Sequence, residues 1–427
     1  MQLGTQIVPV AVPDHCTIWE AIDALLKSQQ VSGTVLRWGL VSLTGHEALI
    51  EIATASGDSA EPPKPKIESG QSGANGVIVS LVIPTGVGAD IGGFIGDAGP
   101  VAKALGAVAD LVIVHPNVVN AADFYAGSER TVCVDGFTLD EFFKGKTQIA
   151  RPHHARIGVV IDRLEAQLRS RIINAINGLR AVAGVDVIGY VECEEKIQSW
   201  ISRSKFGHYT GQVENADVLF HAAQRLQEEG ANALAVVTAI AGIPKEEVNR
   251  HYMGNGPNPV GSVEALISRF ITWKTGLPCA HAPAFVEGLG DSSAIVDSRA
   301  ASEVASGSGL PCLLFGLSQA AQVVQHGGIG VRDLCAIIVP FDCAGGLPAR
   351  AAHQFRVPLL AVKANKCIIG AAANRLNVGT TVALENYAEV IAFLACRRAG
   401  VSWESIRRPL ELSKPITAFP HVLSRGA

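Results

Sequence analysis

The stretch VIVSLVIPTGVGADIGGFIGDAGP at residues 77–100, followed by DLVIVHPN at residues 110–117, decides the fold. An apolar run leads into a glycine-rich turn and a short helical segment, and a second apolar run ends on a histidine beside a proline. Short apolar runs bounded by glycine and proline are typical of buried strands in a parallel sheet, because helices cover both faces of such strands. The stretch therefore predicts a strand, a glycine-rich loop, a helix and a second strand.

The same plan occurs twice more along the chain. The second unit contains ALAVVTAI at 233–240, GNGPNPVGS at 254–262 and LPCAHAP at 277–283, and the third contains CAIIVPFDCAGGLP at 335–348 and VPLLAVKAN at 357–365. Strands that alternate with helices in this way are typical of an α/β fold with a parallel sheet. We therefore expect a mostly parallel sheet built from three strand–Gly-rich loop–helix–strand units.

A small βαββ unit is expected before these three units. Thr17 and Glu20 have the spacing of a capping box and open a helix between strand-like segments. A stretch rich in Pro, Gly and Ser follows and is typical of a linker. The expected organisation is a small α+β domain at 1–62, a linker at 63–76, and an α/β ligand-binding or catalytic core at 77–427, with a division into lobes 77–200 and 201–427 left open.

Composition narrows the class of protein. The 427 residues are 48% hydrophobic and 17% charged, which favours an apolar subunit interface and hence a homo-oligomer. The longest apolar runs are shorter than the roughly 18 residues that span a membrane. No signal peptide is visible at the N-terminus, and the nine cysteines include no Cys-x-x-Cys pair, so we expect a cytoplasmic protein without a membrane partner.

The charge pattern points to a small-molecule ligand. A formal net charge of −4 without a basic patch argues against a nucleic-acid partner. The glycine-rich loop after residue 84 matches neither the phosphate loop nor a convincing NAD or FAD fingerprint. Two interpretations of this loop stay open: a cradle for a phosphate or carboxylate, or a tight connection from strand to helix.

Candidate catalytic residues stand at the ends of the predicted strands. His115, His281 and Lys363 each end an apolar run, and ligands of open α/β sheets bind at the carboxyl ends of the strands. We therefore expect these three side chains to meet in one site, together with Asp90 from the first glycine-rich loop. The residues expected to bind substrate are Thr85, Gly86, Gly88, Gly92, Gly93, Asn117, Asn120, His208, Asn255, Asp342, Gly345, Gly346 and Asn365.

A divalent metal is an open alternative for the same residues. The two histidines could bind a metal ion together with Asp90, Asp342 or Glu264. The sequence contains no helix with a His-x-x-x-His or His-Glu-x-x-His pattern, so we assign no metal ligand and leave the cofactor unknown.

Several of these motifs resemble those of a known family. The segments IPTGVGADIGGFIGDAGP, HPNVVNAADF, DVLFHAAQRL, GPNPVGSVEALIS, PCAHAPA and IIVPFDCAGG occur in fixed order. In this order they resemble an uncharacterised family of bacterial and plastid proteins (DUF3326-like). The resemblance covers most of residues 77–365 and implies a shared fold and a shared pocket, but no reaction.

From the residues themselves we expect a small-molecule enzyme, a hydrolase, that acts on a polar, anionic or carbonyl-containing metabolite. Its histidines and Asp90 would exchange protons, while Lys363 and the glycine-rich loops would bind the anion. An isomerase or lyase that moves a proton next to a carbonyl is the first alternative. A protein that binds a nucleotide or metabolite without turnover is the second.

Overall fold

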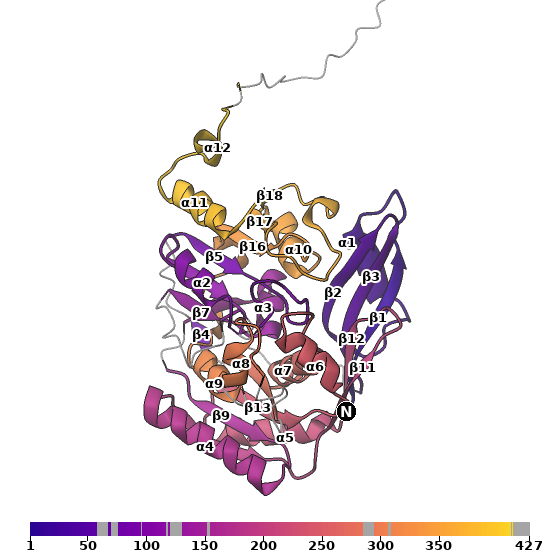
Figure 1. Ribbon diagram of the computed structural model, residues 1–427, viewed down its shortest axis with the longest axis vertical. Coiled ribbons are helices and arrows are strands. Elements are labelled where there is room, and N and C mark those ends of the chain that lie inside the picture. The colour runs from indigo at the N-terminus through magenta and orange to yellow at the C-terminus, as the bar shows by residue number, and fades with distance from the viewer. Residues whose placement is uncertain are drawn as a thin grey trace, which may run out of the picture.

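The computed structural model describes residues 1–57, 67–69, 76–94, 96–116, 118–119, 130–151, 154–284, 294–305, 309–410 and 412 (Figure 1). Asn117 and Asn120 lie outside the described residues, as do most of the expected linker at 63–76 and the last residues, 413–427.

The first and third predicted units share one six-stranded parallel sheet, in the order β18-β17-β16-β5-β6-β7. Its strands are β5 (Ile78–Leu81), β6 (Leu111–Val114), β7 (Thr131–Cys133), β16 (Ala336–Pro340), β17 (Leu359–Val362) and β18 (Thr381–Leu384). Helices α2 (Gly99–Leu105) and α11 (Tyr387–Arg398) pack on one face, and α3 (Gly136–Phe143) and α10 (Leu347–Phe355) pack on the other. All residues of β5, β6, β16 and β17 are buried, as expected for strands covered on both faces.

The second predicted unit belongs to a separate four-stranded parallel sheet, in the order β10-β9-β13-β14. Its strands are β9 (Ile157–Ile161), β10 (Val187–Glu192), β13 (Ala233–Ala239) and β14 (Cys279–Ala284). Helices α4 (Ala166–Ala183) and α9 (Leu310–Ser318) cover one face, and α5 (Ala216–Glu228) and α7 (Gly261–Thr275) cover the other. The α/β class with parallel sheets is confirmed, and the three units are divided between two sheets.

The N-terminal residues form part of a five-stranded antiparallel sheet, in the order β11-β12-β1-β3-β2 (Figure 1). Strand β1 (Leu3–Ala11), helix α1 (Ile18–Leu26), β2 (Thr34–Thr44) and β3 (Glu47–Ala55) follow one another in the expected βαββ order, and α1 begins with the predicted capping box. Strands β11 (Gln198–Arg203) and β12 (Tyr209–Glu214) complete the sheet, because β12 pairs with β1.

The stretch KFGHYTGQVE at 205–214 is polar and contains two glycines, a composition that predicts a loop, and this prediction is wrong for most of its residues. Tyr209–Glu214 is strand β12, and only the turn between β11 and β12 is a loop. The strand buries Thr210, Gly211 and Val213, whereas Gln212 is exposed and Tyr209 and Glu214 are partly exposed. A strand with one face toward solvent can carry polar residues on that face, and these residues made the strand difficult to recognise in the sequence.

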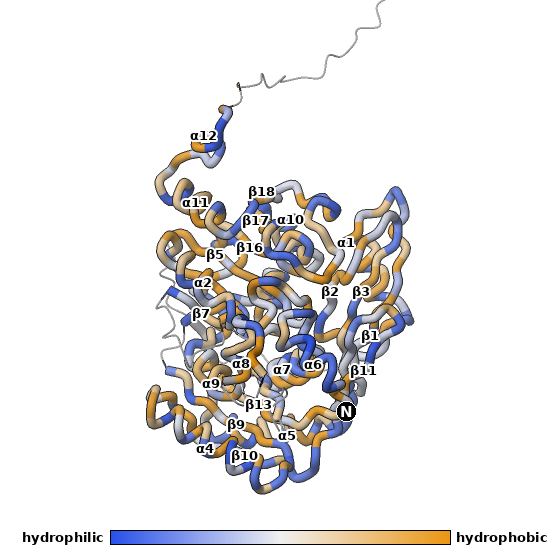
Figure 2. Tube along the Cα trace, in the orientation of Figure 1, coloured by the Kyte–Doolittle hydropathy of each residue, from blue (hydrophilic) through white to orange (hydrophobic). Residues whose placement is uncertain are grey.

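The remaining elements are short. Strands β4 (Ile67–Ser69), β8 (Gln148–Ala150) and β15 (Gln322–His326) form a small sheet. Helix α6 (Lys245–Tyr252) is largely hydrophilic, as Figure 2 shows, whereas α8 (Ala301–Ala305) and α12 (Trp403–Ile406) are single turns. Across the described residues, each helix is too short or too polar to cross a lipid bilayer.

Candidate functional site

A cavity of about 260 Å³ lies where the three larger sheets meet. The six-stranded sheet contributes the loop after β5 and the end of β6, and the four-stranded sheet contributes β14. The five-stranded sheet contributes β2 and the turn between β11 and β12. Helix α7 and the loop before it supply a further side. The N-terminal unit thus forms part of the site.

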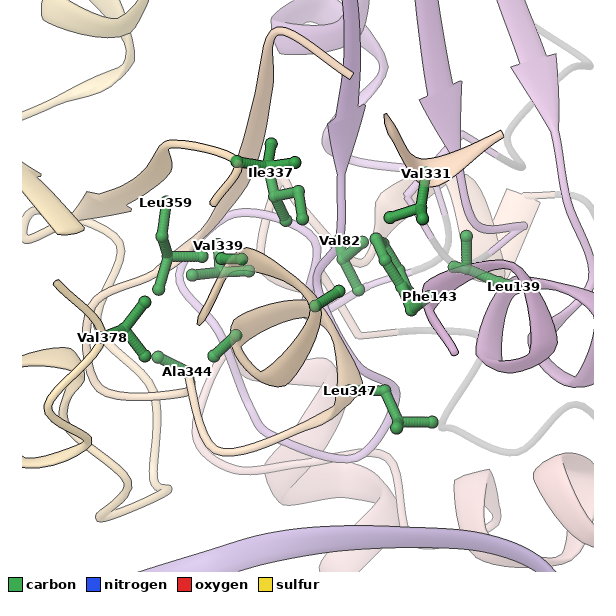
Figure 3. Close-up of a cluster of buried hydrophobic side chains, with 14 of the residues drawn as sticks. Val82, Leu139, Phe143, Val331, Ile337, Val339, Ala344, Leu347, Leu359 and Val378 are labelled. Carbon is green, nitrogen blue, oxygen red and sulfur yellow. The ribbon is translucent and has the colours of Figure 1, made fainter. Parts of the chain in front are cut away.

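The floor of the cavity is apolar. Val82, Leu139, Phe143 and Val339 line it and also belong to the hydrophobic cluster on one face of the six-stranded sheet, which Figure 3 shows. Leu139 and Phe143 belong to α3 and Val339 belongs to β16 of the third unit, so the floor of the cavity is part of the hydrophobic core. The polar side chains that line the cavity therefore come from its walls. A mostly apolar cavity with a few polar side chains is usual for small-molecule sites.

Two glycines let the walls approach closely. A Cβ on Gly345 would lie 2.5 Å from the Leu40 Cβ, and the Leu40 backbone N–H donates to the Gly345 carbonyl at 2.7 Å. A Cβ on Gly211 would lie 2.9 Å from the Val263 backbone nitrogen. A larger residue at either position would separate two walls, because a contact below 3 Å forces atoms apart.

His115 and His281 line this one cavity, as expected. His115 follows β6 at the carboxyl edge of the six-stranded sheet. His281 lies inside β14, opposite Val236 of β13, and not at the end of its strand as expected. Burial lowers the pKa of His115 to about 3, assisted by the guanidinium groups of Arg269 and Arg37. Burial lowers the pKa of His281 to about 3 as well. Both imidazoles are therefore neutral at physiological pH.

His281 has one ring nitrogen without a hydrogen-bond partner. Its Nε2 lies 2.8 Å from the Thr238 Oγ1 on the neighbouring strand, whereas its buried Nδ1 has no partner. The residue is 7% exposed. An unsatisfied buried polar atom costs about 1–3 kcal/mol, which a ligand atom in the cavity would offset.

Glu264 is the carboxylic acid of the cavity with the most altered ionisation. It lies in the first turn of α7 and is partly exposed to the cavity. Burial raises its pKa to about 8, and the nearby Glu303 carboxylate adds to the rise. A carboxyl group that titrates near neutral pH is suited to general acid–base chemistry.

Two ion pairs stand beside the histidines. Arg37 on β2 pairs with Glu51 on β3, with 2.9 Å between Nη1 and Oε1, and Arg269 on α7 pairs with Asp140 on α3. All four residues line the cavity. Sequence reasoning missed them, although Arg37 and Arg269 each interrupt an apolar stretch, TVLRWGLVSL and ALISRFITW. A charge inside such a stretch is a usable signal of a buried polar site.

Lys363 does not reach the cavity, which corrects the expectation that it meets the two histidines. Its Nζ lies 2.6 Å from the Glu385 Oε1, and its side chain is 42% exposed. The reason is the order of the strands: β17 lies beside the edge strand β18, so its carboxyl end faces Glu385.

Asp90, Asp342 and Asn365 are also outside the residues that line the cavity. Asp90 and Asp342 lie 3.8 Å from the nitrogens of Arg299 and Lys366, respectively. Asn365 is 1% exposed, and it holds the first glycine-rich loop through hydrogen bonds to the backbone N–H and carbonyl of Ile91. These three side chains therefore have structural partners.

The predicted binding residues divide into two groups. The members that line the cavity are Thr85, Gly86, His208, Gly345 and Gly346. The described members that do not are Gly88, Gly92, Gly93 and Asn255, with Asp342 and Asn365. Gly92 and Gly93 are needed for packing, since a Cβ would lie 2.5 Å from the Ile83 Cδ1 and 2.1 Å from the Ala89 oxygen, respectively. At Gly92 and Gly93, the glycine-rich loop is therefore better interpreted as a tight connection from strand to helix than as a cradle for a phosphate or carboxylate.

Metal binding receives no support from the part of the chain that the structure describes. No three His, Cys, Asp or Glu side chains come together there in a way that could hold a metal ion. The open alternative of a site made by the two histidines with Asp90, Asp342 or Glu264 therefore has no matching geometry among these residues.

Comparison with known proteins places the chain beside others without an assigned function. A family profile described as "Protein of unknown function (DUF3326)" matches residues 78–407. The chain is also 31% identical over 329 residues to an "Uncharacterized lipoprotein" of Synechococcus sp., which covers 75% of this chain and 90% of that protein. No solved structure is significantly similar to the chain.

These findings correct two expectations. A lipoprotein carries a lipid that holds it at a membrane, so the name of the relative contradicts the expected cytoplasmic location. The description of the same relative as an uncharacterised lipoprotein also conflicts with the expectation of a hydrolase.

Proposed function

Since the chain belongs to the DUF3326 family, whose function is unknown, we propose from the site itself that it is an isomerase or lyase that moves a proton next to a carbonyl group. The observation that carries the proposal is the presence of Glu264, with a pKa of about 8, in a cavity that also holds two neutral imidazoles. Environments that push the pKa values of neighbouring groups apart are typical of acid–base sites.

Glu264 is the proposed proton acceptor. Its carboxylate takes the proton from the carbon next to the carbonyl, and the electron pair of that C–H bond moves onto the carbonyl oxygen as an enolate. In a substrate with a hydroxyl group on the deprotonated carbon, the hydroxyl proton passes to the enolate oxygen and the proton on Glu264 returns to the former carbonyl carbon, so that the carbonyl group moves by one carbon and the reaction is an isomerisation. In a substrate with a leaving group on the next carbon along the chain, the enolate re-forms the carbonyl, a C=C bond forms, and the leaving group departs with its bonding electron pair, which is an elimination. A base whose pKa lies near the working pH is effective in both reactions.

The imidazoles are the proposed partners of the carbonyl oxygen. A base whose conjugate acid has a pKa of about 3 accepts protons poorly, so His115 and His281 fit the role of hydrogen-bond donors better than that of proton acceptors. A neutral imidazole N–H can stabilise the negative charge that develops on an enolate oxygen. Arg269 adds positive charge beside His115.

The test follows exchange of carbon-bound hydrogen. The protein is incubated in D₂O with a panel of three- to five-carbon aldehydes, ketones and 2-oxo acids, and loss of the proton signal next to the carbonyl is followed by NMR. We expect at least one compound to exchange, and Glu264→Gln to slow exchange by about 100-fold or more. Glu228→Gln, which makes the same change at an exposed position on α5, is the matched control.

Two results would overturn the proposal. Exchange that continues at the wild-type rate in Glu264→Gln would exclude Glu264 as the base. Binding of a panel compound without any exchange would instead favour a protein that binds a metabolite without turnover.

A further inference from the structure

Two cysteines from different segments of the chain meet beside the cavity. Cys343 lies in the loop after β16, and Cys367 lies in the loop after β17. The Cys343 thiol donates a hydrogen bond to the Cys367 sulfur. Both residues are free cysteines and partly exposed, and Cys343 lines the cavity. The contact therefore places two thiols, and not a single one, at a wall of the candidate site.

Backbone hydrogen bonds hold the two loops in this arrangement. Cys343 and Ala371 form a parallel bridge, and the Ala371 N–H donates to the Asp342 carbonyl at 3.0 Å. The Ile368 N–H donates to the Val87 carbonyl at 3.0 Å, which ties the second loop to the first glycine-rich loop. The positions of the two sulfur atoms are thus set by the backbone on either side of them.

The two thiols differ in their readiness to ionise. The Cys367 sulfur accepts hydrogen bonds from the Cys343 thiol and from the Ile369 backbone N–H, and these hydrogen bonds lower the pKa of Cys367. The hydrogen bond to Cys367 and burial of the sulfur raise the pKa of the Cys343 thiol. The thiolate is the form of cysteine that attacks a disulfide. Cys367 is therefore the attacking group, and Cys343 keeps its proton until the second step.

We propose that Cys343 and Cys367 are a reversible modification site, at which a small-molecule disulfide oxidises the two thiols to one disulfide within the chain. Sulfur atoms that share a hydrogen bond need a small rearrangement to reach the bonding distance of about 2.05 Å. The inference makes no use of the proposed function, and it holds equally for a protein that binds a ligand without turnover.

The reaction is two successive thiol–disulfide exchanges, written here for glutathione disulfide. The Cys367 thiolate attacks one sulfur of glutathione disulfide, the S–S bond of that molecule breaks, and one glutathione thiolate leaves. Cys343 then gives its proton to solvent, and its sulfur attacks the Cys367 sulfur of the mixed disulfide. The second glutathione thiolate leaves with the bonding electron pair. The two cysteines lose two electrons, and glutathione disulfide gains them.

The new bond would join two parts of the cavity wall. The residues after Cys343, namely Ala344, Gly345 and Gly346, line the cavity, and so does Ile368 from the second loop. Oxidation therefore alters a surface that a ligand in the cavity would meet.

The experiment is disulfide mapping of the full chain. The protein is equilibrated at pH 7.5 with mixtures of glutathione and glutathione disulfide, free thiols are alkylated, and the peptides are identified by mass spectrometry without reduction. We expect a linked peptide pair that contains Cys343 and Cys367. Its amount should rise with the proportion of glutathione disulfide and fall to zero after treatment with dithiothreitol. This measurement needs no variant, so it does not depend on how a substituted chain folds.

Two variants separate the steps of the reaction. Cys343→Ser removes the thiol that completes the exchange, so Cys367 should accumulate as a mixed disulfide with glutathione. In Cys367→Ser, Cys343 should react with glutathione disulfide about 10-fold or more slowly, because its thiol resists ionisation. The matched control is Cys16→Ser, which removes another partly exposed cysteine, before α1, and should form the linked peptide pair as the wild type does.

The opposite results count against the proposal. A wild-type chain in which both cysteines stay reduced at high glutathione disulfide would overturn it. So would a chain in which Cys367 carries glutathione but never links to Cys343. Equal rates of glutathione attachment in Cys343→Ser and Cys367→Ser would overturn the order of attack. Because these results are read from peptide masses, they are independent of the hydrogen-exchange test of the proposed function.

Discussion

The ionisation of Glu264 predicts an unusual dependence of stability on pH. Burial raises its pKa from the ordinary value of 4.5 to about 8. A raised pKa in a carboxyl group means that the folded state resists ionisation, so the contribution of Glu264 to stability is greatest below pH 4.5 and is lost as the pH rises toward 8. Substitution by glutamine removes the ionisation and therefore the loss.

The size of the effect follows from the pKa. A tenfold change in an acid dissociation constant is worth about 1.4 kcal/mol, so a rise from 4.5 to about 8 costs the ionised form about 4–5 kcal/mol. Glu264 is partly exposed to the cavity, and water there reduces this cost. We therefore expect Glu264→Gln to be more stable than the wild type by about 2–4 kcal/mol at pH 9, relative to the difference at pH 4.

The assay is the thermal unfolding midpoint of both proteins from pH 4 to pH 9. The difference between the two midpoints should grow between about pH 4.5 and pH 8 and then stay constant. Glu228→Gln on the surface of α5 is the control and should show no such trend. A difference between Glu264→Gln and the wild type that is the same at pH 5 and pH 9 would refute the reasoning, because Glu264 would then ionise as an ordinary glutamate.

Two further changes test the charges around the site. Asp140→Asn leaves the buried guanidinium of Arg269 without its carboxylate and should lower the free energy of unfolding by about 3–5 kcal/mol, measured as a lower unfolding midpoint. The control is Asp186→Asn, which breaks a surface pair with His154 and should lower the free energy of unfolding by less than about 1 kcal/mol. Lys363→Ala breaks an exposed pair with Glu385 and should change the free energy of unfolding by less than about 1 kcal/mol. It should also leave the exchange of carbon-bound hydrogen in the substrate unchanged, and a large loss of this exchange would show that Lys363 takes part in the site.

The sequence predicted the local structure better than the arrangement of its parts. The capping box at Thr17, the buried strands and the positions of His115 and His281 at the cavity all follow from short-range patterns. Such patterns show that a strand is buried, but they do not show which strand lies beside it. This is why Lys363, which follows a strand of the same type, was expected in the cavity and lies elsewhere.

The missed residues belong to contacts between distant segments. Arg37 lies in the N-terminal unit and Arg269 in α7, and both reach the cavity because the five-stranded sheet packs against the two parallel sheets. Glu264 was considered as a metal ligand, and its raised pKa depends on burial that no pattern in the sequence reveals. Residues of this kind require the tertiary structure, because their chemistry depends on what surrounds them.

The pairing of early strands with late ones has a consequence for biosynthesis. Leu3 in β1 lies opposite Val213 in β12, and Val79 in β5 lies opposite Ala336 in β16. At roughly 5–20 residues per second, a ribosome needs on the order of tens of seconds to travel from one strand of the second pair to the other. Until then the nascent polypeptide exposes strand edges, so newly made copies depend on protection from aggregation, such as chaperones provide, more than a protein with local contacts does.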